Sequence, residues 1–120
     1  MAKSYSVSLD TIVREHKLNI LRRGPDYDQV RIDNWDVTRP GLALAGFYDY
    51  YDPNRVQTLG KLELTYLEDM PPEARRQSIE RFLSSGIRFF IVAHALAVPE
   101  MMLRAAERNA VTVLTTEQST

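Results

Sequence analysis

The sequence predicts an α/β fold in which helices pack on a small, mostly parallel sheet. In the second half of the chain, apolar stretches typical of strands alternate with amphipathic stretches, in the order strand, helix, strand, helix, strand. Successive parallel strands need a long return connection, and helices supply it while they cover the sheet. With 120 residues, 44% hydrophobic and 26% charged, the chain has the profile of one domain with a single modest core, so we treat residues 1–120 as one domain.

The first half of the chain is predicted to hold one helix and short extended segments. Ser8 can cap a helix whose apolar positions recur at helical spacing from Leu9 to His16. Residues 18–21 and 29–32 are extended candidates, and a Gly-Pro pair between them predicts a turn.

The second half is more regular. Residues 55–59 alternate as a half-buried strand. The next segment, residues 61–69, also fits a strand pattern, but we favour a helix. A proline pair then predicts a helix start at Pro72, with Gly86 as its left-handed C-terminal cap.

The last three elements complete the alternation. We expect a buried strand over residues 87–93, a helix over residues 99–108 and a final strand over residues 111–114.

Charge and composition exclude several classes of partner. Fifteen Lys and Arg against sixteen Asp and Glu give a net charge of −1, which argues against a nucleic-acid surface or an anionic membrane as the partner. Cysteine is absent, so no disulfide framework or thiolate site is possible. The longest apolar run, residues 89–98, is too short to span a bilayer and the N-terminus lacks a signal-peptide core, so we expect a cytoplasmic protein without membrane contact.

No nucleoside-triphosphate loop is predicted. Residues 41–46 have the glycine spacing of a phosphate loop, but Phe47 and Tyr48 replace the required Lys and Ser or Thr. Gly60-Lys61 would need a glycine at position 55, where the chain has Arg55. We therefore assign no catalytic residue.

Anion binding is the one ligand chemistry that the residues suggest. His94 follows a buried strand, and open α/β sheets place ligands at the carboxyl ends of their strands. The alternative for His94 is a strand-end histidine that bonds to its neighbours, and His16 belongs to a helix face. The anion-binding candidates are Gly60, Lys61 and His94.

An aromatic segment, residues 47–51, is the richest aromatic cluster of the chain. Arg39-Pro40-Gly41 predicts a type II turn that would present these rings on an irregular segment. Rigid amphipathic rings suit a partner surface, although some of them could instead plug the core. Asp49 and Asp52 could hold a divalent cation, but two carboxylates without further acidic ligands nearby favour turn chemistry. The interface candidates are Arg39, Phe47, Tyr48, Asp49, Tyr50, Tyr51 and Asp52.

Residues 36–52, DVTRPGLALAGFYDYYD, carry a family resemblance. They resemble the segment DV-x-RPGL-x-L-x-GF-x-D-[YF]-[YF] in the N-terminal domain of bacterial HPr kinase/phosphorylase. Residues 55–57, Gly60 to Glu63, and Tyr66-Leu67 follow in the family's order, so the resemblance covers essentially the whole chain.

The resemblance implies a parent enzyme of the cytosol. Such enzymes use ATP or pyrophosphate, with magnesium, to phosphorylate a serine of the phosphocarrier HPr, and they reverse this with inorganic phosphate in carbon catabolite control. Their catalytic motifs lie in a C-terminal kinase domain that has no counterpart in these 120 residues. The resemblance thus implies a non-catalytic regulatory and assembly domain without a cofactor of its own, which contacts the kinase domain and the neighbouring subunits of a hexamer and meets HPr only through the full-length protein.

The same family domain resembles the N-terminal domains of Mur ligases, which contact a uridine nucleotide. The alternative expectation is therefore a Mur-ligase-like module that senses a small anion or a nucleotide through Gly60, Lys61 and His94.

Overall fold

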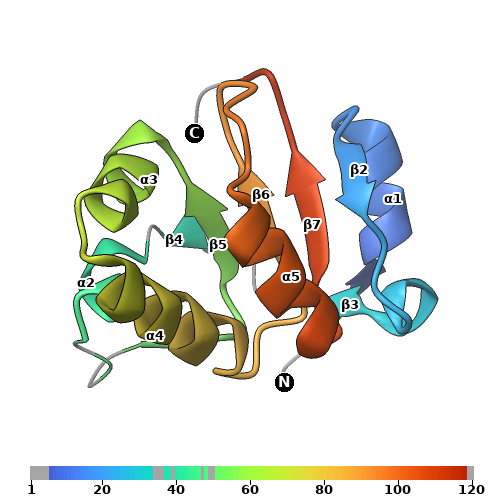
Figure 1. Cartoon of the computed structure of the whole chain (residues 1–120). Coiled ribbons are helices and arrows are strands. Elements are labelled where there is room, and N and C mark those ends of the chain that lie inside the picture. The colour runs from blue at the N-terminus through green and yellow to red at the C-terminus, as the bar shows by residue number, and fades with distance from the viewer. Residues whose placement is uncertain (1–5, 34–36, 39, 47, 49–50, 119–120) are drawn as a thin grey trace.

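A mixed sheet forms the centre of the computed structural model, which describes residues 6–33, 37–38, 40–46, 48 and 51–118 (Figure 1). The strand order is β2-β7-β6-β5-β4, in which β2 (Asn19–Arg22) is antiparallel to β7 and the other pairs are parallel. The parallel strands are β4 (Val37–Thr38), β5 (Val56–Leu59), β6 (Phe89–Val92) and β7 (Thr112–Thr115). The prediction of an α/β fold on a mostly parallel sheet is confirmed.

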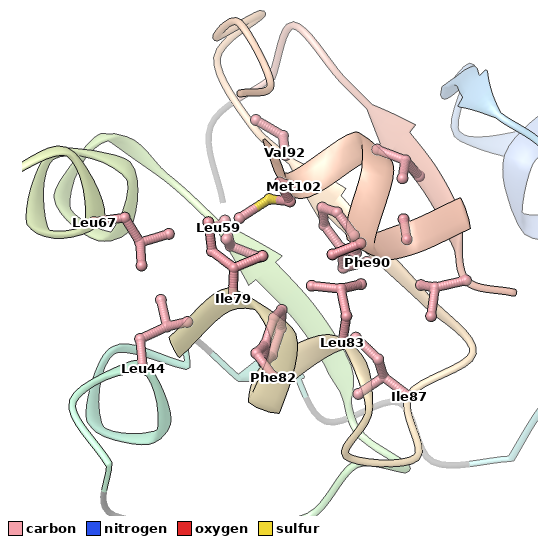
Figure 2. Packing of buried hydrophobic residues seen from close by; sticks show 14 residues of the cluster. Leu44, Leu59, Leu67, Ile79, Phe82, Leu83, Ile87, Phe90, Val92 and Met102 are labelled. Atoms are coloured by element: carbon pink, nitrogen blue, oxygen red, sulfur yellow. The ribbon is translucent and has the colours of Figure 1, made fainter. Parts of the chain in front are cut away.

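Helices cover one face of this sheet (Figure 1). They are α2 (Gly41–Leu44), α3 (Lys61–Glu68), α4 (Pro72–Leu83) and α5 (Glu100–Arg108). Beneath them lies the larger core, in which Phe82 of α4 packs edge-on against Phe90 of β6 with ring centroids 6.1 Å apart (Figure 2). Ser78 donates a hydrogen bond of 2.6 Å to the Leu44 carbonyl and so ties α4 to α2.

The opposite face carries a second core. There α1 (Leu9–Glu15), the antiparallel pair β1 (Val7–Ser8) and β3 (Arg31–Ile32), and the 3-10 turn Tyr27–Gln29 pack on β6 and β7. Because successive strand residues point to opposite faces, Phe89 enters this second core while Phe90 enters the first. The sheet is therefore buried on both sides.

Several expected elements are confirmed. The Ser8 Oγ accepts the Thr11 N–H at 3.2 Å and caps α1. Residues 61–68 form a helix, and α4 begins at Pro72. Gly86 has a positive φ of 103°, although it lies just beyond Ser84, which is the C-cap of α4.

Two local predictions are wrong. The expected type II turn at residues 39–41 requires a positive φ at Gly41, whereas Gly41 is the first residue of α2 and its carbonyl accepts the Ala45 N–H at 3.1 Å. Proline suits the residue before a helix, and Gly46, with a φ of 103°, takes the left-handed position that ends it. In the expected strand 29–32, Gln29 belongs to the 3-10 turn and only Arg31–Ile32 pair with β1.

Candidate functional site

The carboxyl ends of three parallel strands meet at one edge of the sheet. Leu59 pairs with Val92, which in turn pairs with Thr115, so β5, β6 and β7 end level with one another. Main-chain bonds continue past these ends: the Ala93 N–H donates to the Leu59 carbonyl at 2.9 Å, and the Thr116 N–H donates to the Val92 carbonyl at 3.0 Å. We call this the carboxyl edge, the place where open α/β sheets bind ligands.

Gly60 and Lys61 enter the carboxyl edge from β5. Gly60 is buried as the N-cap of α3, and its N–H donates to the Glu63 Oε1 at 2.7 Å. Lys61, the first residue of α3, is exposed. The start of α3 therefore carries the exposed positive charge of Lys61 beside a buried carboxylate that already binds the cap N–H.

His94 enters the same edge from β6. It is exposed, and both it and Ala95 have left-handed backbone conformations, with φ of 60° and 53°. The His94 N–H donates to the Gln118 carbonyl at 3.1 Å and the Ala95 N–H to the Thr116 carbonyl at 2.8 Å. Such backbone conformations cost about 1 kcal/mol or more in non-glycine residues and persist only where the surroundings hold them.

The sheet thus brings the predicted anion-binding candidates to one edge. Within the described part of the chain, the side chains of Lys61 and His94 have no hydrogen-bond or ion-pair partner. Together with the first N–H groups of α3, they offer positive potential to a small anion.

Two open grooves flank the loop that follows His94. One, of about 300 Å³, lies between α3, α4 and this loop, and its lining includes Lys61, Leu64, Thr65, Leu96 and Pro99. The other, of about 400 Å³, lies between β2 and the same loop, and its lining includes Leu21, Ala95, Val98, Leu103 and Thr116. The loop after His94 therefore forms a wall of both grooves.

Part of the aromatic segment packs on α4. Tyr51 is half-buried, its ring contacts Phe82 edge-on at 6.5 Å, and its hydroxyl shares a hydrogen bond of 2.9 Å with Ser85. Burial raises the pKa of Tyr51 to about 12. Tyr51 therefore extends the larger core.

Tyr48 covers Tyr51 and reaches a charged side chain. The two tyrosine rings meet edge-on at 5.1 Å, and the Arg81 guanidinium lies 4.1 Å from the centre of the Tyr48 ring. The Tyr48 hydroxyl is buried without a partner in the portion of the chain that the structure covers, and burial raises the pKa of Tyr48. A half-buried ring capped by a cation is a stiff, amphipathic patch.

The remaining interface candidates divide into two groups. Asp52 is half-buried and its carboxylate accepts the Asn54 N–H at 2.9 Å, which is the turn chemistry that the sequence favoured. Among the described residues, no group of three or more His, Asp or Glu side chains could hold a metal ion. The other candidates, Arg39, Phe47, Asp49 and Tyr50, lie outside the described residues.

Sequence reasoning missed two buried polar residues around β5. Gln57 is fully buried, and its Nε2 donates to the carbonyls of Asp52 at 3.1 Å and Arg55 at 3.2 Å. Glu63 is 2% exposed, and its place three residues after the helix N-cap was a usable signal because acidic residues there often bind the cap N–H. The alternation of residues 55–59 gave no sign that Gln57 is buried, because a polar residue in a half-buried strand is expected to face solvent.

Comparison with known proteins identifies the family of the chain. A family model described as HPr Serine kinase N terminus matches residues 7–120. The chain belongs to this family. The match includes the carboxyl edge, both grooves and the aromatic segment, so all of these features lie within the HPr kinase N-terminal domain.

Curated relatives agree with this assignment. The chain is 35% identical over 114 residues to HPr kinase/phosphorylase of Clostridium perfringens, covering 95% of this chain and 36% of the relative. It is 36% identical over 115 residues to HPr kinase/phosphorylase of Streptococcus pneumoniae, covering 96% of this chain and 37% of the relative. The chain therefore spans little more than a third of the length of these relatives and corresponds to their N-terminal domain.

One solved structure resembles the fold. The CBS and DRTGG domains of the regulatory region of Clostridium perfringens pyrophosphatase match with a TM-score of 0.64 and 13% identity, covering 94% of this chain and 42% of that chain. At this identity the likeness supports the α/β architecture alone. The Mur-ligase likeness remains a prediction. No helix in the described part of this HPr kinase N-terminal domain is long and apolar enough to cross a bilayer.

Proposed function

We propose that this HPr kinase N-terminal domain is the non-catalytic regulatory and assembly part of a cytoplasmic HPr kinase/phosphorylase. In this proposal the longer protein phosphorylates a serine of HPr with ATP or pyrophosphate and magnesium, and its C-terminal domain carries that chemistry. The family match over residues 7–120 and the relatives' greater length support the proposal.

The structure of residues 41–46 is the observation that carries the non-catalytic part. A phosphate loop binds its nucleotide with main-chain N–H groups that stay free for the phosphates. Here the N–H groups of Leu44, Ala45 and Gly46 donate to the carbonyls of residues 40, 41 and 43 at 2.9, 3.1 and 2.9 Å. The glycines that mimic a phosphate loop are thus the ends of a short helix, and we assign this domain no cofactor.

The aromatic segment supports the assembly part. Tyr48, held by Tyr51 and capped by Arg81, is a preorganised patch. Preorganised aromatic and arginine side chains are favoured anchors at protein interfaces. In this proposal they contact the kinase domain and the neighbouring subunits of a hexamer, and HPr is a partner of the full-length protein.

Removal of the domain tests the proposal. The product of the complete gene is compared with a version that lacks residues 1–118, by light scattering for the number of subunits per assembly and by phosphate transfer to HPr. We expect transfer to survive while the number of subunits, or the response of transfer to inorganic phosphate, changes. An unchanged number of subunits together with an unchanged response would contradict a regulatory and assembly role.

A pair of point variants locates the surface. Tyr48→Ala in the complete protein is expected to change the number of subunits per assembly, or the response of transfer to inorganic phosphate, in the same direction as the deletion. Tyr66→Ala is the matched control, because Tyr66 is 41% exposed on α3 and is not part of the aromatic cluster. Equal behaviour of the two variants would remove the aromatic segment from the proposal.

A second candidate function is the sensing of a small anion or a nucleotide. The pyrophosphatase regulatory region with the similar fold is described in complex with its activator, diadenosine tetraphosphate. The exposed side chains of Lys61 and His94 at the carboxyl edge favour an anionic ligand in this domain as well.

Thermal melting tests this candidate. We expect the melting temperature to rise with phosphate, a sugar phosphate, a uridine nucleotide or diadenosine tetraphosphate, and the rise to be lost in Lys61→Ala but kept in Lys17→Ala, a control at another exposed lysine. A flat response to all four compounds would exclude ligand sensing by this edge.

A further inference from the structure

The C-terminal segment of the described chain crosses the carboxyl edge from β7 toward β5. Thr116, just after β7, binds both the Val92 carbonyl and the Ala95 N–H, and Gln118 then accepts the His94 N–H. The segment therefore moves from the end of β7 onto the end of β6. The next strand in that direction is β5, whose continuation is Gly60-Lys61.

The groove between α3 and α4 opens at that point. Lys61 belongs to its lining, and Leu96 and Ala97, on the loop after His94, form its other wall. Its floor contains Leu67 and Ile79, which are buried members of the larger core (Figure 2). A groove with an apolar floor and a polar rim fits a peptide segment that brings an apolar side chain.

Some exposed residues of helix α3 line the groove and others do not. Lys61, Leu64, Thr65 and Glu68 follow helical spacing along the groove. Leu62 and Tyr66, also four residues apart, do not line it and are 71% and 41% exposed. The two sets offer a direct comparison on one helix.

We propose that the groove between α3, α4 and the loop after His94 docks the polypeptide that follows residue 120 in the longer protein. The inference rests on the proposed function, because it requires the relatives' greater length, of which the chain covers 36%. The occupant is covalently attached beside the groove, so its effective concentration is high and a single apolar side chain is enough to hold it.

Docking would also couple the linker to the carboxyl edge. The left-handed His94 and Ala95 are held by the carbonyls of Gln118 and Thr116, and the same loop continues into the groove wall at Leu96. A displacement of the chain after Gln118 would therefore shift both the loop after His94 and the wall of the groove that this loop forms. In the longer protein this arrangement transmits the position of the following domain to the edge that carries Lys61 and His94.

Thiol labelling tests the docking, because residues 1–120 contain no cysteine. Thr65→Cys places a thiol in the groove, and Leu62→Cys places one on the same helix at a position that is 71% exposed and does not line the groove. Labelling rates at each position are measured by peptide mass spectrometry in the 120-residue chain and in the product of the complete gene. We expect Thr65→Cys to react at least tenfold more slowly in the complete product, and Leu62→Cys to react equally in both.

Protection of both positions, or of neither, would overturn the docking. Hydrogen exchange of the unsubstituted proteins gives a second readout, in which the amides of His94 and Ala95 should exchange more slowly in the complete product. Phosphate transfer to HPr by the same preparation separates the two proposals: transfer without groove protection refutes only the docking, whereas absence of transfer refutes the proposed function.

Discussion

Gln57 holds the turn that joins the aromatic segment to β5. Its Nε2 donates to the carbonyls of Asp52 and Arg55, while its Oε1 is buried without a partner in the part of the chain that the structure describes. Unsatisfied buried acceptors are costly, so the two bonds that the Gln57 amide makes must offset the cost of its unpaired Oε1. This turn positions Tyr51 against α4.

Gln57→Met is expected to lower the free energy of unfolding by about 1–3 kcal/mol, because it leaves two main-chain carbonyls without their donor. The measurement is urea unfolding at pH 7. Gln77→Met is the matched control, since Gln77 is exposed on α4 and donates only to Glu73. A loss of unfolding free energy no greater than that of the control would show that the turn does not depend on the hydrogen bonds from Gln57.

The half-buried Tyr51 should make the fold less stable at alkaline pH. Its pKa is raised to about 12 from the ordinary tyrosine value of 10.0, chiefly by burial. Above pH 10 the unfolded chain releases this proton first, so the stability that the neutral hydroxyl contributes is complete below pH 10 and is lost as pH rises toward 12.

Tyr51→Phe should therefore be less stable than the parent chain at pH 8, where the hydrogen bond with Ser85 is intact, and should lose less stability between pH 8 and pH 11. Urea unfolding at the two pH values measures both effects. Tyr66→Phe, at a 41% exposed site, is the control. Parallel pH dependences for Tyr51→Phe and the parent would contradict the assigned burial.

The sequence predicted those site features that are local. The turn role of Asp52 and the position of Gly60 at the start of a helix depend on neighbours a few residues away. Tyr51 could not be separated from an exposed tyrosine, because its partner Ser85 is 34 residues distant, just after the end of α4. The left-handed backbone of His94 could not be predicted either, because its N–H donates to the carbonyl of Gln118, which is distant in the sequence.

The carboxylate of Glu80 joins helices α4 and α5 by hydrogen bonds. Glu80 on α4 accepts hydrogen bonds from Arg108 at 2.6 Å and from Asn109 at 2.8 Å, at the end of α5. These bonds, that from Arg108 first, lower the pKa of the Glu80 carboxyl. A lowered pKa stabilises the fold above the unfolded value of about 4.3, and the contribution is lost as pH falls through the folded value.

Glu80→Gln is expected to cost about 0.5–1 kcal/mol at pH 7, because the pair is partly exposed and screened by solvent. The cost should vanish below the folded pKa of Glu80, where the parent carboxyl is protonated as well. Denaturant unfolding at pH 7 and pH 3 measures the difference. Glu73→Gln, which removes an ion pair within α4, is the control. An equal cost for both variants would argue against a stabilising contact between α4 and α5 through Glu80.

The loop after β6 stores backbone strain. Ala95 has a φ of 53°, so Ala95→Gly should leave the free energy of unfolding unchanged or raise it by up to about 1 kcal/mol. Ala105→Gly, inside α5, should instead lower it by about 1 kcal/mol or more. Thermal melting compares the two variants, and equal destabilisation would contradict the left-handed conformation of Ala95.

Element prediction succeeded where the pattern is long. The twelve-residue helix α4 and the nine-residue helix α5 each have a proline start and an amphipathic face. The two-residue strands β1 and β4 were missed, because their formation depends on pairing with Ile32 and Val56 rather than on their own residues. The helix α2 was missed because Pro40-Gly41 indicated a type II turn and the glycines of residues 41–46 have the spacing of a phosphate loop.

In the molecule as a whole, the sheet separates two hydrophobic clusters, whereas composition predicted one modest core. The second cluster exists because α1 and the β1–β3 pair return to the far face of β6 and β7. This leaves the helices α3, α4 and α5 on one side and the carboxyl edge open at the strand ends (Figure 1). The open edge, which we propose as a ligand site, and the pair of Tyr48 and Tyr51 on α4, which we propose as a contact for neighbouring domains, are therefore distinct surfaces.

Phosphate transfer from labelled ATP to HPr decides whether this chain is the accessory domain of a kinase. The 120-residue chain and the product of the complete gene are assayed side by side with magnesium. We predict label on HPr only with the complete product, because the N–H groups of residues 44–46 already donate to main-chain carbonyls and do not form a phosphate loop. Transfer by the 120-residue chain alone, or by neither protein, would contradict this account.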